Sequence, residues 1–336
     1  MNILVTGGAG FIGSCVTRYL VKGGDKRLLQ SPDVKVAVVD NLSNGFEHNL
    51  ADLQDHPNFL GLFKIDLKDR EKLARLFSKG GFDLCYHLAA SISVQKSIDD
   101  PESAYLGDVV ATFNLLEECR KYKTRVVYVS TCMVYAPAAS NLIDEFHPVQ
   151  CASPYAASKI SCEKLVESYH HTYGLWTLIL RPFNTYGPGQ RFDGEGGVIV
   201  KFLNQKMADG EITVYGDGLQ TRDFMYVTDC ARFIAQSGLE LGLDGLVLNA
   251  GTGRDITIRE VAELVASDGT TIRHLPHPHP QSEKKKLCCN YTLAYQLLGW
   301  LPLIGLEEGL LLTASWLESE LIKGKESGIG LHNGAN

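Results

Sequence analysis

The chain has 336 residues, of which 45% are hydrophobic, and its formal net charge is −7. This length and composition can support a large buried α/β core. The acidic balance and the scattered Lys and Arg residues exclude a basic surface for nucleic acid, and no apolar stretch is long enough to span a membrane. We therefore expect a soluble protein that binds a small molecule, with no nucleic-acid or membrane partner.

Cysteine usage indicates the compartment. The nine cysteines are an odd number, are spread along the chain and include no Cys-x-x-Cys pair. This pattern predicts free thiols in a reducing compartment rather than a disulfide framework or a zinc site. The His-Pro patch at 276–280 predicts a solvated loop, because no further metal ligands cluster near it. We expect a cytoplasmic protein without a metal site.

Short apolar runs alternate with helical patterns through the first half of the chain. The expected strands read "NILVTG", "VKVAVVD", "LGLFKIDL", "DLCYHLAA", "RVVYVST" and "LWTLILRP". Between them, "DREKLARLFSKG" and "VVATFNLLEECRKY" have apolar residues at helical spacing. Continuous apolar strands are typical of a parallel sheet that helices cover on both faces. The pattern therefore predicts an α/β fold of the Rossmann type, with a doubly wound parallel sheet.

After "RPFNTYGPGQ" the sequence changes to short mixed elements rich in Gly, Pro and Tyr. We predict that residues 1–183 form the Rossmann domain and that residues 184–330 form mainly a smaller α/β substrate lobe. The chain is expected to return to the first domain near 224–250, because "FMYVTDCARFIAQSG" is helical in pattern and "LVLNAG" is strand-like. The lobe is expected over the carboxyl ends of the strands, where open α/β sheets bind ligands.

The turn after the first expected strand predicts a dinucleotide site. It reads "VTGGAGFIG", with Gly7, Gly10 and Gly13 before and within the start of a helix. Glycines at this spacing let the backbone approach a pyrophosphate at the helix N-terminus, although they also occur in simple tight turns. The next strand ends at Asp40, whose carboxylate can accept both hydroxyls of a ribose and repel the extra phosphate of NADP. NAD is therefore the predicted cofactor.

The segment "SPYAASK" predicts a helix that begins with a proton-transfer pair. Ser153 suits the N-cap and Pro154 the first helical position, so Tyr155 and Lys159 lie one turn apart on one face. A phenol with a pKa of about 10 is a poor base at neutral pH, and a nearby ammonium group stabilises its phenolate. The pair can therefore transfer protons, although Tyr-x-x-x-Lys also occurs on exposed helices without such a role.

Taken together, the motifs resemble those of the extended short-chain dehydrogenases that act on nucleotide-activated sugars. The glycine turn, "HLAA", "STCMVY", "SPYAASK", "RPFNTYGP", "YGDGLQTRDFMYVTD", "NAGTG" and "LLGWLP" occur in the family's order over nearly the whole chain. The resemblance implies an NAD-dependent enzyme that uses and regenerates its bound cofactor in each turnover. It also implies a homodimer formed through the helices that follow Asp100 and Pro154.

The resemblance also implies roles for individual residues. Tyr155 would take the proton of the sugar 4-hydroxyl, with Lys159 lowering the pKa of that phenol and holding the nicotinamide ribose. Thr131 would bond the same sugar oxygen, and Asn184 and Arg222 would hold the nucleotide diphosphate. Segment 191–203 is expected to cover the sugar nucleotide. The predicted cofactor-binding residues are Gly7, Gly10, Phe11, Ile12, Gly13, Asp40, Asn41, Asp66, Leu67, Leu88, Ala89, Ala90, Tyr155 and Lys159.

Two departures from the family's pattern affect these roles. Asp108 stands where the family usually has Asn, and we expect its carboxylate to pair with Lys159. The usual nucleotide-binding Arg is missing from "HPHPQSEKKKLCCNYT", where Lys284, Lys285 or Lys286 can substitute for it.

The stretch "STCMVY" decides which reaction we predict. Family members that eliminate water usually have Asp and Glu at the positions of Cys132 and Met133, and members that decarboxylate a glucuronate usually keep the Glu. A 4-epimerase needs no acid or base there, only room for the 4-keto sugar to rotate. We therefore predict a nucleotide-sugar 4-epimerase, with UDP as the favoured nucleotide.

Three alternatives stay open. A 4,6- or 5,6-dehydratase could use the thiol of Cys132 as its acid or base. A UDP-glucuronate decarboxylase is less favoured, because Met133 replaces the usual Glu. A nucleotide sensor without activity is least favoured, because both Tyr155 and Lys159 are present.

Overall fold

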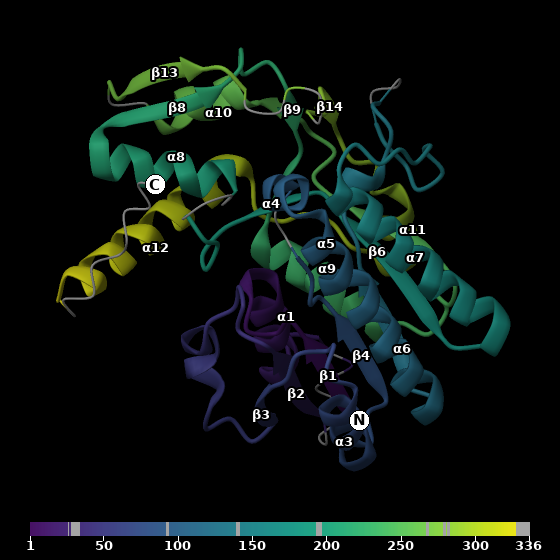
Figure 1. Ribbon diagram of the computed structural model, residues 1–336. Helices are drawn as coiled ribbons and strands as arrows, with labels where there is room; N and C mark the ends of the chain where they lie inside the picture. Colours follow the sequence, from purple (N-terminus) through teal and green to yellow (C-terminus); the bar gives the residue numbers. More distant parts are fainter. Residues whose placement is uncertain are drawn as a thin grey trace.

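A parallel sheet lies at the centre of the molecule (Figure 1). The structure, a computed structural model, describes residues 1–25, 27, 34–91, 94–138, 142–192, 197–266, 269–277, 280 and 283–326. These residues form seven parallel strands in the order β11-β6-β5-β4-β1-β2-β3. The strands are β1 (Asn2–Thr6), β2 (Lys35–Asp40), β3 (Phe59–Lys64), β4 (Leu84–His87), β5 (Arg125–Val129), β6 (Thr177–Pro182) and β11 (Val247–Ala250).

Helices cover both faces of this sheet, which explains why the strands are apolar on both sides. In β1, Ile3 and Val5 pack into one buried cluster, whereas Leu4 packs into another. The first cluster includes α1 (Phe11–Val21) and α9 (Val227–Leu239), and the second includes α3 (Arg70–Gly80), α6 (Ala111–Tyr122) and α7 (Pro154–Tyr173). The predicted doubly wound fold is confirmed.

The chain between β4 and β6 passes the carboxyl end of the sheet twice. After β4 come α4 (Val94–Asp99), α5 (Pro101–Tyr105) and a π-helical segment, η2 (Leu106–Val110), which continues directly into α6. After β5 comes a short 3-10 turn, η3 (Cys132–Val134). Another 3-10 segment, η1 (Glu47–Leu53), follows β2.

The smaller lobe lies over the carboxyl end of the sheet (Figure 1). Its buried cluster includes Phe202, Val214, Val261 and Leu317. The elements of the lobe are α8 (Val198–Asp209), β8 (Glu211–Tyr215), β9 (Thr221–Arg222), β12 (Ile256–Thr257), α10 (Ile258–Val265), β13 (Thr271–Leu275), β14 (Lys286–Leu287) and α12 (Leu306–Glu326).

The chain returns to the sheet after it has entered the lobe. α9 packs against α1, and β11 pairs with β6 at the edge of the sheet. α11 (Thr292–Leu298) and Trp300 also pack into the core of the Rossmann domain. The helix expected over 224–238 begins only at Val227, because β10 (Phe224–Tyr226) pairs with β7 (Asn184–Tyr186). No helix in the described part of the chain is long and apolar enough to cross a membrane.

Candidate active site

One cavity of about 970 Å³ lies between the carboxyl ends of the strands and the smaller lobe. Parallel strands place the loops that follow them at one edge, so residues far apart in sequence meet there. The cavity brings together all the predicted catalytic, cofactor-binding and diphosphate-binding residues except the lysines proposed as substitutes for the missing Arg. These are Gly7, Gly10, Phe11, Ile12, Gly13, Asp40, Asn41, Asp66, Leu67, Leu88, Ala89, Ala90, Thr131, Cys132, Tyr155, Lys159, Asn184 and Arg222.

The glycine turn at the floor of the cavity has no room for side chains. A Cβ atom on Gly13 would lie 2.1 Å from the backbone oxygen of Gly7, and one on Gly7 would lie 2.7 Å from the nitrogen of Ala89. Gly7 also has a φ of 69°, which favours glycine. α1 begins directly after Gly10, whose lack of a side chain leaves the first N–H groups open to an anion. This turn fits the pyrophosphate of a dinucleotide.

Asp40 lies beside this turn, at the end of β2. Its Oδ2 accepts a hydrogen bond from the Ala9 N–H (3.0 Å) and its Oδ1 accepts one from the Leu42 N–H (2.8 Å). A carboxylate has about four acceptor positions, so both oxygens keep capacity for ribose hydroxyls. At the next strand end, Asp66 accepts a hydrogen bond from the Asn41 amide at 3.3 Å. These acceptors fit the ribose hydroxyls of NAD, and the carboxylate of Asp40 would repel the further phosphate of NADP.

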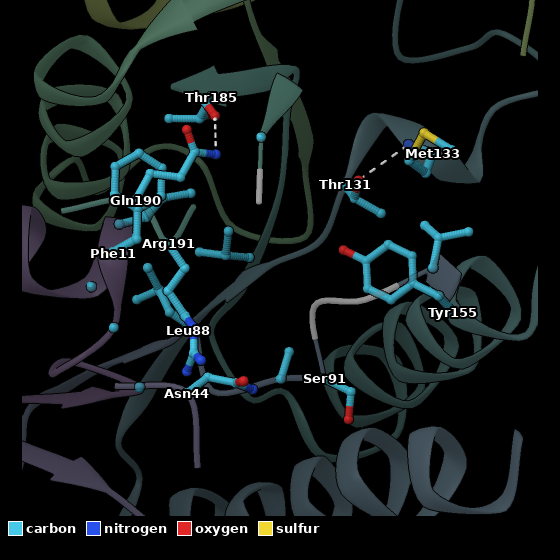
Figure 2. Close-up of a pocket in the computed structure, with 18 of the residues that line it drawn as sticks. Phe11, Asn44, Leu88, Ser91, Thr131, Met133, Tyr155, Thr185, Gln190 and Arg191 are labelled. Atoms are coloured by element: carbon cyan, nitrogen blue, oxygen red, sulfur yellow. Dashed lines mark hydrogen bonds between the residues drawn. The ribbon is translucent and has the colours of Figure 1, made fainter. Parts of the chain in front are cut away.

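The N-terminus of α7 presents Tyr155 and Lys159. Ser153 is the N-cap, its hydroxyl accepting a hydrogen bond from the Ala156 N–H at 3.2 Å, and Pro154 is the first helical residue, as predicted. Burial raises the pKa of Tyr155, the charge of Asp108 raises it further, and a hydrogen bond with Thr131 lowers it. Figure 2 shows Thr131 and Tyr155 lining the same pocket. The phenol therefore depends on its surroundings to give up a proton.

Lys159 extends from α7 beneath the cavity and is 4% exposed. Its ammonium donates a hydrogen bond to the Val129 oxygen (3.2 Å) and lies 5.2 Å from the centre of the Tyr128 ring. The expected pairing with Asp108 is wrong, because no ion pair joins these two described residues. The carboxylate instead accepts hydrogen bonds from the Ser91 N–H and the Ser158 hydroxyl, both at 2.6 Å. These donors are nearer to Asp108 than the ammonium.

Arg222 lies in the smaller lobe at the other end of the cavity. Its guanidinium donates hydrogen bonds to the backbone oxygens of Thr221 (2.8 Å) and Lys284 (2.7 Å) and forms an ion pair with Glu283. Asn184 also lines the cavity, and its buried Oδ1 has no hydrogen-bond partner in the described part of the chain. An unpartnered buried polar atom that lines the cavity suits a polar ligand at this position.

The proposed lysine substitutes do not reach the cavity. Lys284 is 2% exposed and donates hydrogen bonds to the backbone oxygens of Tyr135 and Gln150, so it ties two loops together. Of the described cavity-lining residues, none is Lys284, Lys285 or Lys286. The expectation for Lys284 is therefore wrong, because its ammonium finds backbone acceptors within the protein.

Sequence reasoning missed several polar residues that line the cavity. His277 Nε2 lies 2.8 Å from Glu283, which also pairs with Arg222. Lys201 lies over the ring of Tyr215, at 5.1 Å from its centre. No motif marks Lys201, His277 or Glu283, which come from different parts of the lobe. The cavity-lining residues to which the sequence assigned no individual role include Gln190, Arg191, Lys201, Tyr215, His277 and Glu283, although Arg191 and Lys201 lie in the segment expected to cover the sugar nucleotide.

Segment 191–203 was expected to cover the sugar nucleotide. Its residues 193–196 lie outside the described residues, as do 278 and 279 of the His-Pro patch. The rest of the segment contributes Gly197, Val198 and Phe202 to the cavity wall. Near it, Gln190 donates a hydrogen bond to the Thr185 oxygen at 3.2 Å (Figure 2). Among the described residues, no group of three or more His, Cys, Asp or Glu is placed to hold a metal ion.

Comparison with known proteins identifies the family. A family model described as "NAD dependent epimerase/dehydratase family" matches residues 3–248. The chain belongs to this family. The sequence motifs predicted a family of NAD-dependent epimerases and dehydratases that act on nucleotide sugars. The family match and the named relatives confirm this prediction.

Several relatives and solved structures are similar to nearly the whole of this chain. The structure of Pal from Bacillus thuringiensis has a TM-score of 0.90 and 47% identity, covering 95% of this chain and 100% of that one. A UDP-glucose 4-epimerase from Thermotoga maritima, solved with UDP-glucose, has a TM-score of 0.86 and 34% identity, covering 96% and 100%. The UDP-glucose 4-epimerase of Mycolicibacterium smegmatis is 33% identical, covering 95% and 99%. Other relatives are named dTDP-glucose 4,6-dehydratase or UDP-glucuronic acid decarboxylase.

Cys132 and Met133 follow Thr131 at the carboxyl end of β5. Both line the cavity in η3, directly after Thr131, whose hydroxyl accepts a hydrogen bond from the Met133 N–H at 3.2 Å (Figure 2). Burial raises the pKa of the Cys132 thiol to about 12, although Arg222 and Lys284 lower it. The thiol therefore keeps its proton at neutral pH and is not suited to act as a base.

Proposed function

We propose that the protein is an NAD-dependent nucleotide-sugar 4-epimerase that acts on a UDP-sugar. One observation carries the proposal: Tyr155 and Thr131 face the cavity that contains the glycine turn, and η3 supplies a thiol and a thioether there instead of carboxylates. Epimerisation at C4 needs one group to move the hydroxyl proton, whereas elimination needs a further acid and base. The residues in η3 therefore favour the epimerase.

The proposed roles follow the positions of the side chains. NAD, when bound by the glycine turn and Asp40, supplies the hydride chemistry at C4. Tyr155 takes the proton of the 4-hydroxyl as C4 is oxidised, and returns it to the 4-oxygen when C4 is reduced. Thr131 orients that oxygen, and Lys159 holds a nicotinamide ribose hydroxyl. Met133 supplies an adaptable apolar wall against which the 4-keto sugar can turn.

We assign the nucleotide diphosphate to the lobe end of the cavity. Arg222 offers a guanidinium, which suits phosphate oxygens, and Asn184 offers the N–H donors of its amide, whereas its unpartnered oxygen can accept from a hydroxyl of the ligand. Glu283 pairs with Arg222 in this structure, so a diphosphate would replace a carboxylate there. The named UDP-glucose 4-epimerases among the relatives support UDP as the nucleotide.

Product analysis tests the function directly. The protein would be incubated separately with UDP-glucose, UDP-N-acetylglucosamine, UDP-glucuronate and dTDP-glucose, and the products identified by NMR and mass spectrometry. We expect a sugar nucleotide of unchanged mass that is inverted at C4, from at least one UDP-sugar. A product lighter by one water, or by carbon dioxide, would refute the epimerase and support the dehydratase or the decarboxylase.

Cys132 supports a second candidate function, because it is the only thiol that lines the described cavity beside Thr131. A dehydratase could use it as an acid, since its raised pKa keeps the proton in place. For the epimerase, Cys132→Ala is expected to retain kcat to within about threefold, because no proton passes through the thiol. Loss of a required acid would instead cost about a hundredfold or more, which would favour the dehydratase.

We also propose that the enzyme works in the cytoplasm as a homodimer. All nine cysteines lie among the described residues and are free thiols, which suits a reducing compartment. Large apolar side chains are exposed along α5, η2 and α6, where a partner subunit can cover them. They are Tyr105, Leu106 and Phe113. Sedimentation at the mass of a single chain would contradict the dimer.

A further inference from the structure

Asp108 lies where the helix before β5 departs from α-helical geometry. The segment Leu106–Val110 is π-helical, and such segments are rare and frequently occur at functional sites. Gly107 approaches the loop after β4 so closely that a Cβ atom on it would lie 2.7 Å from Ser91 Oγ. The π-helical segment therefore places Asp108 next to the loop after β4, which lines the active-site cavity.

The carboxylate of Asp108 joins two parts of the active site. Its Oδ1 accepts a hydrogen bond from the Ser91 N–H, and its Oδ2 accepts one from the Ser158 hydroxyl, both at 2.6 Å. Ser91 and Tyr155 line the same pocket (Figure 2), and Ser158 lies on α7 between Tyr155 and Lys159. Asp108 is 2% exposed, so water competes little for these contacts.

The charge of Asp108 can be separated from its geometry. Both contacts are accepted, as an ionised carboxylate requires. An Asn at this position could accept from the Ser91 N–H with its oxygen and donate to Ser158 Oγ with its amide. The Ser158 hydroxyl would then donate to the Tyr155 oxygen of the backbone, which it already contacts at 2.9 Å. The amide would therefore keep the connection and remove only the negative charge.

We propose that Asp108 is a positioning residue whose buried carboxylate ties the loop after β4 to the helix of Tyr155, beside the phenol that transfers the proton. The proposal rests on the proposed function, in which Tyr155 transfers the proton of the 4-hydroxyl. The charge makes the Tyr155 phenolate a stronger base, which favours taking the proton from the 4-hydroxyl as C4 is oxidised. The two hydrogen bonds of Asp108 hold the helix that carries the phenol in place relative to the loop after β4.

The pKa of Tyr155 supports this role, because among the charged groups that affect it Asp108 has the largest effect. Burial raises this pKa first, Asp108 raises it next, the Thr131 hydrogen bond lowers it, and Cys132 raises it. Lys159, on the same helix, directs its ammonium to the Val129 oxygen instead. The experiment therefore removes the charge of Asp108 and measures the effect on Tyr155.

Burial keeps four neighbouring groups in one charge state near neutral pH. It lowers the pKa of His87 to about 3, so the imidazole is neutral. It raises the pKa of Tyr128, Cys132 and Cys162, which keep their protons. A shift of the pH profile after a change at Asp108 is assigned to Tyr155 where the titration of the phenol moves with it.

Asp108→Asn tests the effect of the charge. Removing it lowers the pKa of Tyr155, so the form that accepts a proton is reached at lower pH. We expect the acidic limb of the pH–rate profile to move down by about 0.5 to 1 pH unit. An ultraviolet difference titration against the same variant with Tyr155→Phe should show the phenol moving in the same direction, without any turnover. If neither the acidic limb of the pH–rate profile nor the titration of the phenol moves from its wild-type pH, the role of the charge is overturned.

Two further variants test the connection. Asp108→Ala removes both contacts and is expected to lose about tenfold more kcat than Asp108→Asn, with KM changed less than kcat. Ser158→Ala removes one contact but keeps the charge, so we expect a severalfold lower kcat with an acidic limb that does not move down. Full kcat in Ser158→Ala would overturn the positioning role, even if the Asp108 variants failed to fold.

These measurements separate failure of this proposal from failure of the proposed function. The pH profile is followed as substrate-dependent absorbance of the bound nicotinamide, which reports oxidation at C4 whatever the final product is. A product other than the C4 epimer would refute the proposed function but leave the Asp108 comparison valid. A correct product with no shift in Asp108→Asn would refute only the inference about Asp108.

Discussion

Replacing Tyr155 by Phe is expected to lower kcat by at least about a hundredfold, because the phenol is the proposed proton-transfer group at C4. The side chain of Phe fills the same space, so KM and the content of bound NAD should change little. Steady-state kinetics with the UDP-sugar that the enzyme epimerises measures the effect. The comparison isolates one hydroxyl group, which lies at the start of α7 and lines the cavity.

Tyr173→Phe is the matched control for this variant. Tyr173 is the last residue of the same helix, is 54% exposed and packs its ring beside the guanidinium of Arg120. Loss of its hydroxyl should leave kcat within about twofold of wild type, since Tyr173 does not line the cavity and Phe keeps the contact of its ring with Tyr169. If Tyr155→Phe kept more than about a tenth of the wild-type kcat, another group would have to move the proton.

Replacing Glu163 by Gln is expected to lower the free energy of unfolding by about 3 to 5 kcal/mol. The side chains of Glu163 and Arg181 are 3% and 7% exposed, and they form two hydrogen bonds at 2.9 and 2.5 Å. Removing the negative charge leaves a buried guanidinium without a counter-charge. Chemical denaturation followed by circular dichroism measures the loss.

The same variant should also reduce activity, because Glu163 supports the loop that carries Thr131. The Ser130 hydroxyl donates a hydrogen bond to Glu163 Oε1 at 2.5 Å, directly before Thr131. Glu167→Gln, one turn along α7, is the control, since the pair of Glu167 with Lys164 is exposed and such pairs contribute about 0 to 1 kcal/mol. Equal losses in the two variants would show that the buried pair contributes no more than a surface pair.

Local patterns were sufficient for most of the fold. The apolar runs that predict β1 to β6 are each read from a few neighbouring residues, because the side chains of a buried strand must be apolar on both faces. The N-terminus of α7 was predictable for a similar reason, since Ser153 and Pro154 satisfy its cap and first turn. The helical pattern of 224–238 did not predict where the helix begins, because the first three residues form β10, which pairs with β7.

The candidate site was predictable as a set of residues but not as a set of contacts. The predicted cofactor-binding and catalytic residues line one cavity, because most of them follow parallel strands whose carboxyl ends meet. The partners of Asp108 and Lys284 were predicted wrongly, because the charge of a residue does not specify which groups will be within hydrogen-bonding distance. Arg222, Glu283 and His277 likewise meet only after the lobe has folded.

The sequence by itself determined the family, the parallel α/β sheet, the glycine turn and the identity of the residues in η3, since these depend on spacing along the chain. Only the tertiary structure decided that Cys132 is buried with a raised pKa, that Lys159 directs its ammonium to Val129, and that Asp108 joins the loop after β4 to α7. These features depend on distances between segments far apart in sequence, and packing of the whole chain sets those distances.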